Sequence, residues 1–533
     1  MGARGARARH SGEHEHEYEH EHEYEYEQEH EVQGEGESFF LGGIVAFCST
    51  KGGGFRGGTF RGEAVNLLGT DLAVEVAGRY KGAMSIQSSD TTSNKPAAPQ
   101  SAEIAPVSSQ NARVSRPQRH QREWMEYCLD ETLPQNDIAR SVWNYVQMLD
   151  LSPLYAAIRV TKDEAGRSAI APEILMALWL MATIDGIGSA RQLDRACRKD
   201  SRYRWICGGV SVNYHTLSDF RSEQAEFLEK VIVDSVAALI HQGIVPLETV
   251  AQDGMRVRAS AGKSSFRRKP TLEELQRQAD EHLKRLKAEN EDESRPEADA
   301  RRSAAQERAA RERKERIEEA LRQHQELAEK REKRKKGDGE TTRVSTTDPD
   351  ARNMKMANGG FDPAFNVQFS TDANSQVIVG VDVTTEGTDG SEMPPMLDKL
   401  NDKYGKRPSK CLVDSAFATK ESVTEVEQKG TEVIGGIPRA GQLQKNGHDP
   451  HTPQRCDTPE YVRFRERMAQ PESQQLFRQR PKVAEFPNAV CRNQGLRQFL
   501  VRGLRKVKAV ALWHALAFNF RRMLNLGAWP IPT

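Results

Sequence analysis

The stretch Glu248-Thr-Val-Ala-Gln-Asp-Gly-Met-Arg-Val-Arg258 decides the expected fold. Its apolar residues predict a strand, and the acidic–glycine pair at Asp253 predicts where that strand ends. A second predicted strand, 410–414, also finishes on an aspartate, Asp414. A carboxylate at the end of a buried strand is costly unless a cation neutralises it. Two such carboxylates in one region raise the chance of a shared divalent-metal site, with helix caps and turn aspartates as the alternative.

A third carboxylate comes from the most basic part of the chain. Residues 478–508 contain nine lysines and arginines and a single acid, Glu485. Such an acid either forms an ion pair or holds a metal where the cations hold phosphates. The nearest upstream acid, Glu472, is the fallback ligand. Arg492 follows two helical turns after Glu485 and is expected on the same face.

Around these carboxylates the spacing of apolar residues predicts a mixed α/β chain. Helices are expected over residues 138–149, 172–181 and 190–199, from about 216, and over 504–526. Strands are expected at 365–369, 377–384 and 431–435. The charged stretch 270–343 predicts a helical hairpin or short coiled coil, either with a solvated face or with a DNA-contacting one.

Composition limits the possible classes of protein. The chain has 77 basic residues (lysine and arginine) and 77 acidic ones (aspartate and glutamate), so its formal net charge is zero. Residues 1–37 have a net charge of −9, and the rest of the chain therefore has a net charge of +9. This mildly basic body permits a nucleic-acid partner. No run approaches the ~20 apolar residues of a membrane span. Seven scattered cysteines without a CxxC pair argue against a disulfide framework or zinc ribbon and fit a reducing cytoplasm.

The composition of the first part of the chain is not that of a folded domain. Glutamate alternates with histidine or tyrosine over residues 13–31, and residues 89–120 are rich in polar residues and proline. Residues 1–118 are therefore expected to form a disordered tail and linker, of which the first ~110 are dispensable.

The order Asp253, Asp414, Glu485 resembles bacterial insertion-sequence transposases of the DDE type. The similar subgroup has a helical amino-terminal domain and a long charged insert after the first aspartate. The segments that carry the resemblance, over roughly residues 120–525, are Asp185-Gly-Ile-Gly-Ser-Ala-Arg191, Tyr203-Arg-Trp-Ile-Cys-Gly208, Asn213-Tyr-His-Thr-Leu-Ser-Asp-Phe-Arg221, Gln252-Asp-Gly-Met-Arg-Val-Arg-Ala259, Ser345-Thr-Thr-Asp-Pro-Asp-Ala351 and Glu485-Phe-Pro-Asn-Ala-Val-Cys-Arg-Asn-Gln-Gly-Leu-Arg-Gln-Phe-Leu-Val-Arg-Gly-Leu504.

The resemblance implies a ribonuclease H-like mixed sheet in which Asp253, Asp414 and Glu485 are the catalytic and metal-binding residues. They would hold two Mg²⁺ ions, with Mn²⁺ as a possible substitute, for DNA strand cleavage and strand transfer. The implied partners are double-stranded DNA at the element ends and at the target, and a second copy of the chain in the DNA complex. The implied location is the bacterial cytoplasm, on the nucleoid, with no membrane association.

The resemblance also implies a domain order. It comprises a helical DNA-binding domain (119–235), a catalytic domain in two parts (240–264 and 346–526) and a charged helical insert between them (265–345). A turn at 213–216 followed by a helix is compatible with helix-turn-helix DNA binding. The predicted DNA contacts are Arg221, Arg480, Arg492, Arg497 and Arg502.

Several positions depart from the family pattern. Ser415-Ala-Phe417 stands where the family has a glycine pair or Gly-Tyr. Phe477 and Arg480 fall near the family's tyrosine and arginine slots, and Arg492 takes its lysine slot. Pro487 is expected to start the helix that carries the glutamate at its entrance.

Two other functions compete with an active transposase. One is a catalytically inactive copy that only binds DNA, which carboxylate oxygens more than ~8 Å apart would favour. The other is a coiled-coil interaction protein, suggested by residues 270–343 alone. His215 and His514 are expected to be capping neighbours or core residues rather than catalytic ones.

Overall fold

The computed structural model describes residues 127–158, 168–290 and 297–528. The tail and linker expected over residues 1–118 lie outside this part of the chain. The described residues all belong to one compact unit. Within the described ranges, no helix combines the length and the apolar character needed to cross a membrane. The six cysteines described there are all free.

The amino-terminal part is helical, as its apolar spacing predicts. Side chains of Asp137, Ser189, Asp200 and Asn213 cap four of its helices by accepting a backbone N–H from the first turn. Pro172 occupies the first turn of another, where its missing N–H costs nothing. The helices are α2 (Ile138–Gln147), α3 (Ser152–Ala156), α4 (Pro172–Ile184), α5 (Ala190–Lys199), α6 (Ser201–Cys207), α7 (Tyr214–Glu223) and α8 (Ala225–His241), after the 3₁₀ turn η1 (Asp130–Thr132).

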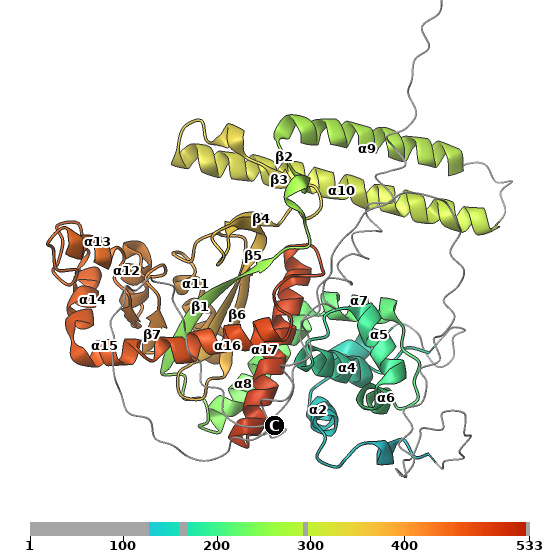
Figure 1. Cartoon of the computed structure of the whole chain (residues 1–533), viewed down its shortest axis with the longest axis horizontal. Coiled ribbons are helices and arrows are strands. Elements are labelled where there is room, and N and C mark those ends of the chain that lie inside the picture. The colour runs from blue at the N-terminus through green and yellow to red at the C-terminus, as the bar shows by residue number, and fades with distance from the viewer. Residues whose placement is uncertain (1–126, 159–167, 291–296, 529–533) are drawn as a thin grey trace, which may run out of the picture. The chain divides into compact units, whose positions relative to one another are not determined.

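A six-stranded mixed sheet follows (Figure 1). Its strands are β1 (Thr249–Arg258), β4 (Arg352–Lys355), β5 (Phe361–Asp372), β6 (Ile378–Thr384), β7 (Lys410–Val413) and β8 (Glu432–Gly435). Strands β6, β5 and β1 pair antiparallel, whereas β1, β7 and β8 pair parallel, and β4 pairs antiparallel with the first part of β5. The expected mixed sheet is therefore confirmed.

The prediction that the first strand ends at Asp253 is wrong. Strand β1 continues to Arg258 because its antiparallel pairing with β5 extends as far as Arg258 opposite Ala364. Only the parallel pairing of β1 with β7 stops early, at Ala251 opposite Leu412. Asp253 thus lies in the middle of a strand, just beyond the point where one neighbour ends.

Helices cover both faces of the sheet. Gln252 points to one face, where its Nε2 donates to the carbonyl of Glu392 at the start of α11 (Met393–Tyr404), 3.0 Å away. Asp253 points to the opposite face because successive strand residues alternate. Further helices are α12 (Lys420–Gln428), α13 (Ala440–Lys445), α14 (Pro459–Ala469), α15 (Pro471–Phe477), the π-helical turn η4 (Pro481–Glu485) and α16 (Phe486–Asn493).

Gly254 is required by close packing behind Asp253. An added Cβ at this position would overlap the Asp389 Oδ1 atom and lie 2.5 Å from Gln368 Nε2. Asp389 Oδ1 accepts from Gln368 and Asn366, at 2.8 and 2.7 Å, in a buried polar network. This network fixes the back of β1 at the residue that follows Asp253.

The last helix, α17 (Leu504–Leu526), has the bounds that the sequence predicts. It is buried on every side between Ala509 and Phe520, as expected of a helix at the centre of a core. It packs against α4, α7, α8 and β6 (Figure 1). One hydrophobic cluster consequently extends from Leu133 to Ala528, so the amino-terminal helices and the sheet share a core.

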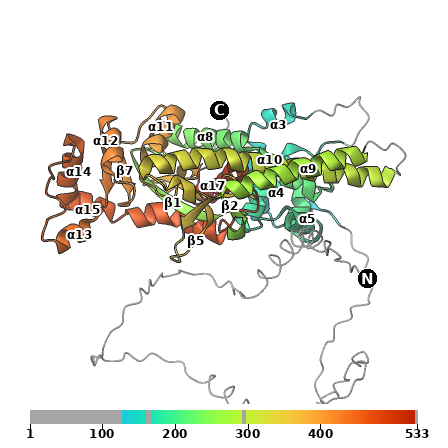
Figure 2. The same cartoon turned by 90° about the horizontal axis from the view of Figure 1, so that it is seen from above.

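The charged stretch forms the predicted helical hairpin. Its helices α9 (Lys269–Asn290) and α10 (Glu297–Arg334) lie side by side in both views (Figures 1 and 2). The hairpin is joined to the sheet through the turns η2 (Lys263–Ser265) and η3 (Gly339–Thr341) and the short pair of strands β2 (Phe266–Arg267) and β3 (Val344–Ser345). Leu272, Ala320 and Val344 form a small separate core at its base.

Candidate active site

Strand pairing places two of the three predicted carboxylates next to each other. Ala251 on β1 is opposite Leu412 on β7, so Asp253 and Asp414, each two residues further on, project from the same face. Asp414 Oδ1 accepts the N–H of Ala416 at 2.8 Å and of Phe417 at 3.3 Å. This turn orients the carboxylate without the glycines that the family pattern has after it.

The third carboxylate arrives on the segment formed by α15, η4 and α16, where η4 contacts β1 and β5. The prediction that the helix starts at about Pro487, with Glu485 at its entrance, is confirmed, because α16 begins at Phe486 and Glu485 is its N-cap residue. The sequence did not indicate that the chain is helical before this point as well: Glu485 has helical dihedral angles (φ −81°, ψ −26°) and ends the π-helical turn η4. Proline is tolerated there because it falls in the first turn of α16, where its missing N–H costs little.

The π-helical turn decides which side chains face the sheet. Arg480 and Glu485 are five residues apart, which would rotate them to about 140° from each other on an α-helix. A π turn closes its hydrogen bonds between residues i and i+5 and brings such a pair to the same side. Arg480 and Glu485 therefore lie on the same side although their spacing is one residue longer than the i, i+4 spacing of an α-helix.

All three carboxylates meet at the guanidinium of Arg480. Its Nη2 lies 3.0 Å from Asp253 Oδ1 and 3.9 Å from Asp414 Oδ2, and its Nη1 lies 3.2 Å from Glu485 Oε1. The remaining oxygen of Asp253, Oδ2, accepts from Asn488 Nδ2 at 2.9 Å. Residues more than 200 positions apart in the chain thus form one cluster.

Asp253 is the most desolvated member of this cluster. Its pKa is raised to about 6, chiefly by burial; the charges of Asp414 and Glu485 contribute to the rise, while Arg480 and the hydrogen bond from Asn488 oppose it. Its side chain is 16% exposed, against 39% for Asp414 and 58% for Glu485. Holding Asp253 ionised therefore costs free energy, which a stronger cation than a single guanidinium would recover.

The donor atoms fit a hard divalent cation, because carboxylate and amide oxygens are the ligands that Mg²⁺ and Mn²⁺ prefer. The buried amide oxygen of Asn488 has no hydrogen-bond partner, so it adds a further potential donor beside Asp253. In the part of the chain that the structure describes, no three acidic, histidine or cysteine side chains are close enough to hold a metal as they stand. Arg480 occupies the space between them.

Two of the predicted DNA contacts are not on the surface. Arg221 is 8% exposed, donates to the carbonyl of Gly188 and lies 4.8 Å above the ring of Trp179. Its prediction as a direct DNA contact is therefore corrected, since the guanidinium is enclosed between helices. Arg480, 8% exposed, is likewise an internal ion-pairing residue in this structure.

The other three predicted DNA contacts, Arg492, Arg497 and Arg502, are exposed. Arg497 and Arg502 lie close to the end of β1, because Arg497 O accepts from Arg258 N at 3.1 Å and Arg502 Nε donates to Ser260 O at 3.2 Å. Arg492 is connected to them because its carbonyl oxygen accepts from Arg497 Nε at 3.2 Å. Glu472, the fallback ligand, is exposed in the first turn of α15. Glu485 is the acid that shares Arg480 with the two aspartates.

Sequence reasoning missed Asn488 and the inward position of Arg480. Asn488 lies three residues after Glu485, which is the spacing of neighbours on a helix face and could have marked it. His514 was expected to be a capping neighbour or a core residue; it lies in the core, and burial lowers its pKa to about 3. His215 is exposed in the first turn of α7.

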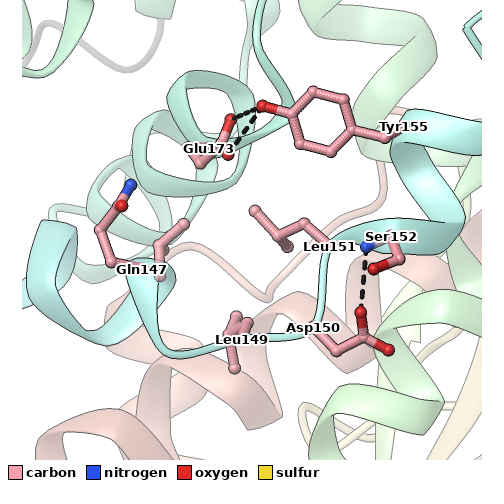
Figure 3. Close-up of a pocket in the computed structure, with 8 residues that line it drawn as sticks. Gln147, Leu149, Asp150, Leu151, Ser152, Tyr155 and Glu173 are labelled. Carbon is pink, nitrogen blue, oxygen red and sulfur yellow. Dashed lines mark hydrogen bonds between the residues drawn. The ribbon is translucent and has the colours of Figure 1, made fainter.

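A small pocket of about 220 Å³ lies among α2, α3 and α4 (Figure 3). The Tyr155 hydroxyl donates to the Glu173 carboxylate at its edge, at 2.7 and 2.8 Å to the two oxygens. The pocket is lined by Val146, Gln147, Leu149, Asp150, Leu151, Ser152, Tyr155 and Glu173. None of these is a predicted site residue. Its size is below that of typical ligand pockets, so the carboxylate cluster is the stronger candidate.

Two parts of the chain match known protein families. Residues 127–223 match the family described as "Transposase domain (DUF772)", and residues 335–520 match the family described as "Transposase DDE domain". Both families are transposase domains, and the second match includes Asp414 and Glu485. The chain belongs to the insertion-sequence transposases of the DDE type. Searches of curated proteins and of solved structures gave no significant match.

Proposed function

We propose that this transposase cuts and joins DNA at the cluster formed by Asp253, Asp414 and Glu485. The observation that carries the proposal is the meeting of these three carboxylates at one guanidinium. Asp253 Oδ1 and Asp414 Oδ2 approach the same nitrogen, which keeps them within ~8 Å of each other as a two-metal site requires. The strand order β6-β5-β1-β7-β8 supports a ribonuclease H-like catalytic domain.

The proposed reaction has two phosphoryl-transfer steps. Water attacks a phosphodiester at the element end, and the departing oxygen takes a proton to become a free 3′-hydroxyl. That hydroxyl then attacks a target phosphodiester, so one bond forms for each bond broken and no ATP is needed. Two Mg²⁺ ions, or Mn²⁺, would stabilise charge at phosphorus when bound.

Individual residues have distinct tasks in this proposal. The three carboxylates hold the cations, and Asn488 fixes the orientation of Asp253 through its 2.9 Å hydrogen bond. The exposed Arg492, Arg497 and Arg502 bind the DNA backbone beside the site. The helical region 119–235 recognises the element ends through surface residues other than Arg221, with a second copy of the chain at the other end.

A transposition assay in bacterial cells tests the proposal. A donor plasmid would carry a resistance marker between the terminal repeats that flank this gene, and the chain would be expressed from a second plasmid. We expect transfer of the marker with the natural chain and none with Asp253→Asn. A chain that binds the repeats but never moves the marker would instead be an inactive, DNA-binding copy.

A further inference from the structure

We infer that Arg480 is an internal competitor for the divalent metal, whose guanidinium must leave the carboxylate cluster before a cation can bind. This inference rests on the metal-dependent function proposed above. It goes beyond that function because it assigns the protein a resting state in which an arginine closes its own site.

The first argument is steric. A metal held by Asp253 and Asp414 would lie about 2.1 Å from an oxygen of each. The Nη2 atom of Arg480 already lies 3.0 Å from Asp253 Oδ1 and 3.9 Å from Asp414 Oδ2. Both cations would need the same space between the same two carboxylates.

The second argument is electrostatic. The cluster has three carboxylates and one guanidinium, and its most buried member, Asp253, depends on that guanidinium for compensation. A divalent ion supplies more charge to the same oxygens, and it would repel a guanidinium that stayed in place. Binding is therefore an exchange of one cation for another.

The third argument concerns how firmly Arg480 is held. Its Nε is buried without a hydrogen-bond partner, so the guanidinium is incompletely satisfied inside the cluster. Its partner Glu485 is 58% exposed, so the cluster is open to solvent on that side. A DNA phosphate is a suitable new partner, because arginine pairs with phosphate as well as with carboxylate.

Binding of Mn²⁺ to the full chain, followed through the electron paramagnetic resonance signal of the free ion, tests this exchange without any DNA. Arg480→Met removes the charge and keeps much of the stem, and Arg480→Gln keeps a polar group. If the closed state holds about nine molecules in ten, both neutral variants should bind Mn²⁺ about tenfold more tightly than the natural chain. Arg480→Lys retains a competing cation and should bind like the natural chain.

Additional measurements separate the possible failures. Melting curves identify any variant that does not fold, and Asp253→Asn combined with Arg480→Met should lose the tight binding if it occurs at this cluster. Neutral variants that bind Mn²⁺ no more tightly than the natural chain would overturn the exchange while leaving the metal site intact. An absence of Mn²⁺ binding in all folded variants would overturn both the exchange and the proposed function.

Discussion

Replacing Asp253 by asparagine should abolish activity and at the same time stabilise the metal-free protein. The pKa of Asp253 is raised from 3.8 to about 6, chiefly by burial. Between these two pH values the folded chain keeps a proton that the unfolded chain has lost. Stability therefore falls as pH rises through this window and stays low above it, and asparagine avoids that loss.

The size of the effect follows from the shift. A shift of two pKa units means that Asp253→Asn should raise the free energy of unfolding by roughly 3 kcal/mol at pH 7.5. At pH 5, where the folded chain still keeps most of the proton, this increase should be about half as large. The side chain is only 16% exposed, so solvent screening reduces this figure little. The partnerless amide oxygen of Asn488 can turn toward the new amide, which keeps the site hydrogen-bonded.

Urea unfolding in EDTA at pH 7.5 and pH 5 measures this difference. The matched control is Asp414→Asn, because Asp414 is 39% exposed and its replacement can still accept the N–H groups of Ala416 and Phe417. We expect the control to change stability much less. An Asp253→Asn chain that is no more stable than the natural one at pH 7.5, or equally stabilised at both pH values, would refute the reasoning.

Three further predictions concern neighbouring features. Gly254→Ala should lower the free energy of unfolding by about 1–3 kcal/mol in urea titrations, because the added methyl overlaps Asp389. Arg221→Met should leave the affinity for DNA unchanged in gel-shift assays, whereas Arg502→Met, at an exposed site, should weaken it and reduce the salt slope by about 1. At sub-saturating Mn²⁺, bound metal measured by paramagnetic resonance should rise as the pH passes through the Asp253 pKa of about 6 and level off roughly one pH unit above it, because the proton on Asp253 competes with the ion.

The sequence predicted the secondary structure around the site well, for reasons that particular elements make clear. Helix α17 is marked by an apolar run between Gly503 and Gly527, and β7 is a short apolar run before Asp414. Such local patterns depend on neighbouring residues and can be read directly. The end of β1 was misjudged because its length is set by pairing with β5, more than 100 residues away.

The inward position of the arginines could not be read from the sequence. Arg480 belongs to a basic run, and only the π-helical turn directs it toward the carboxylates instead of solvent. In the sequence, Arg221 cannot be told apart from a surface arginine. In the structure α17 covers it: the indole N–H of Trp513, 292 residues further along the chain, donates to the backbone carbonyl of Arg221. Burial of this kind depends on tertiary packing, which composition and periodicity do not encode.

The central claim, that three carboxylates form one DNA-cutting site, is tested most directly by nicking of a duplex that carries the element end. The natural chain should nick it with Mg²⁺ and not with EDTA. Asp253→Asn, Asp414→Asn and Glu485→Gln should each bind the duplex without cutting it, while Glu472→Gln should cut like the natural chain. Cutting by Glu485→Gln at the natural rate, or binding without any cutting by the natural chain, would contradict the account.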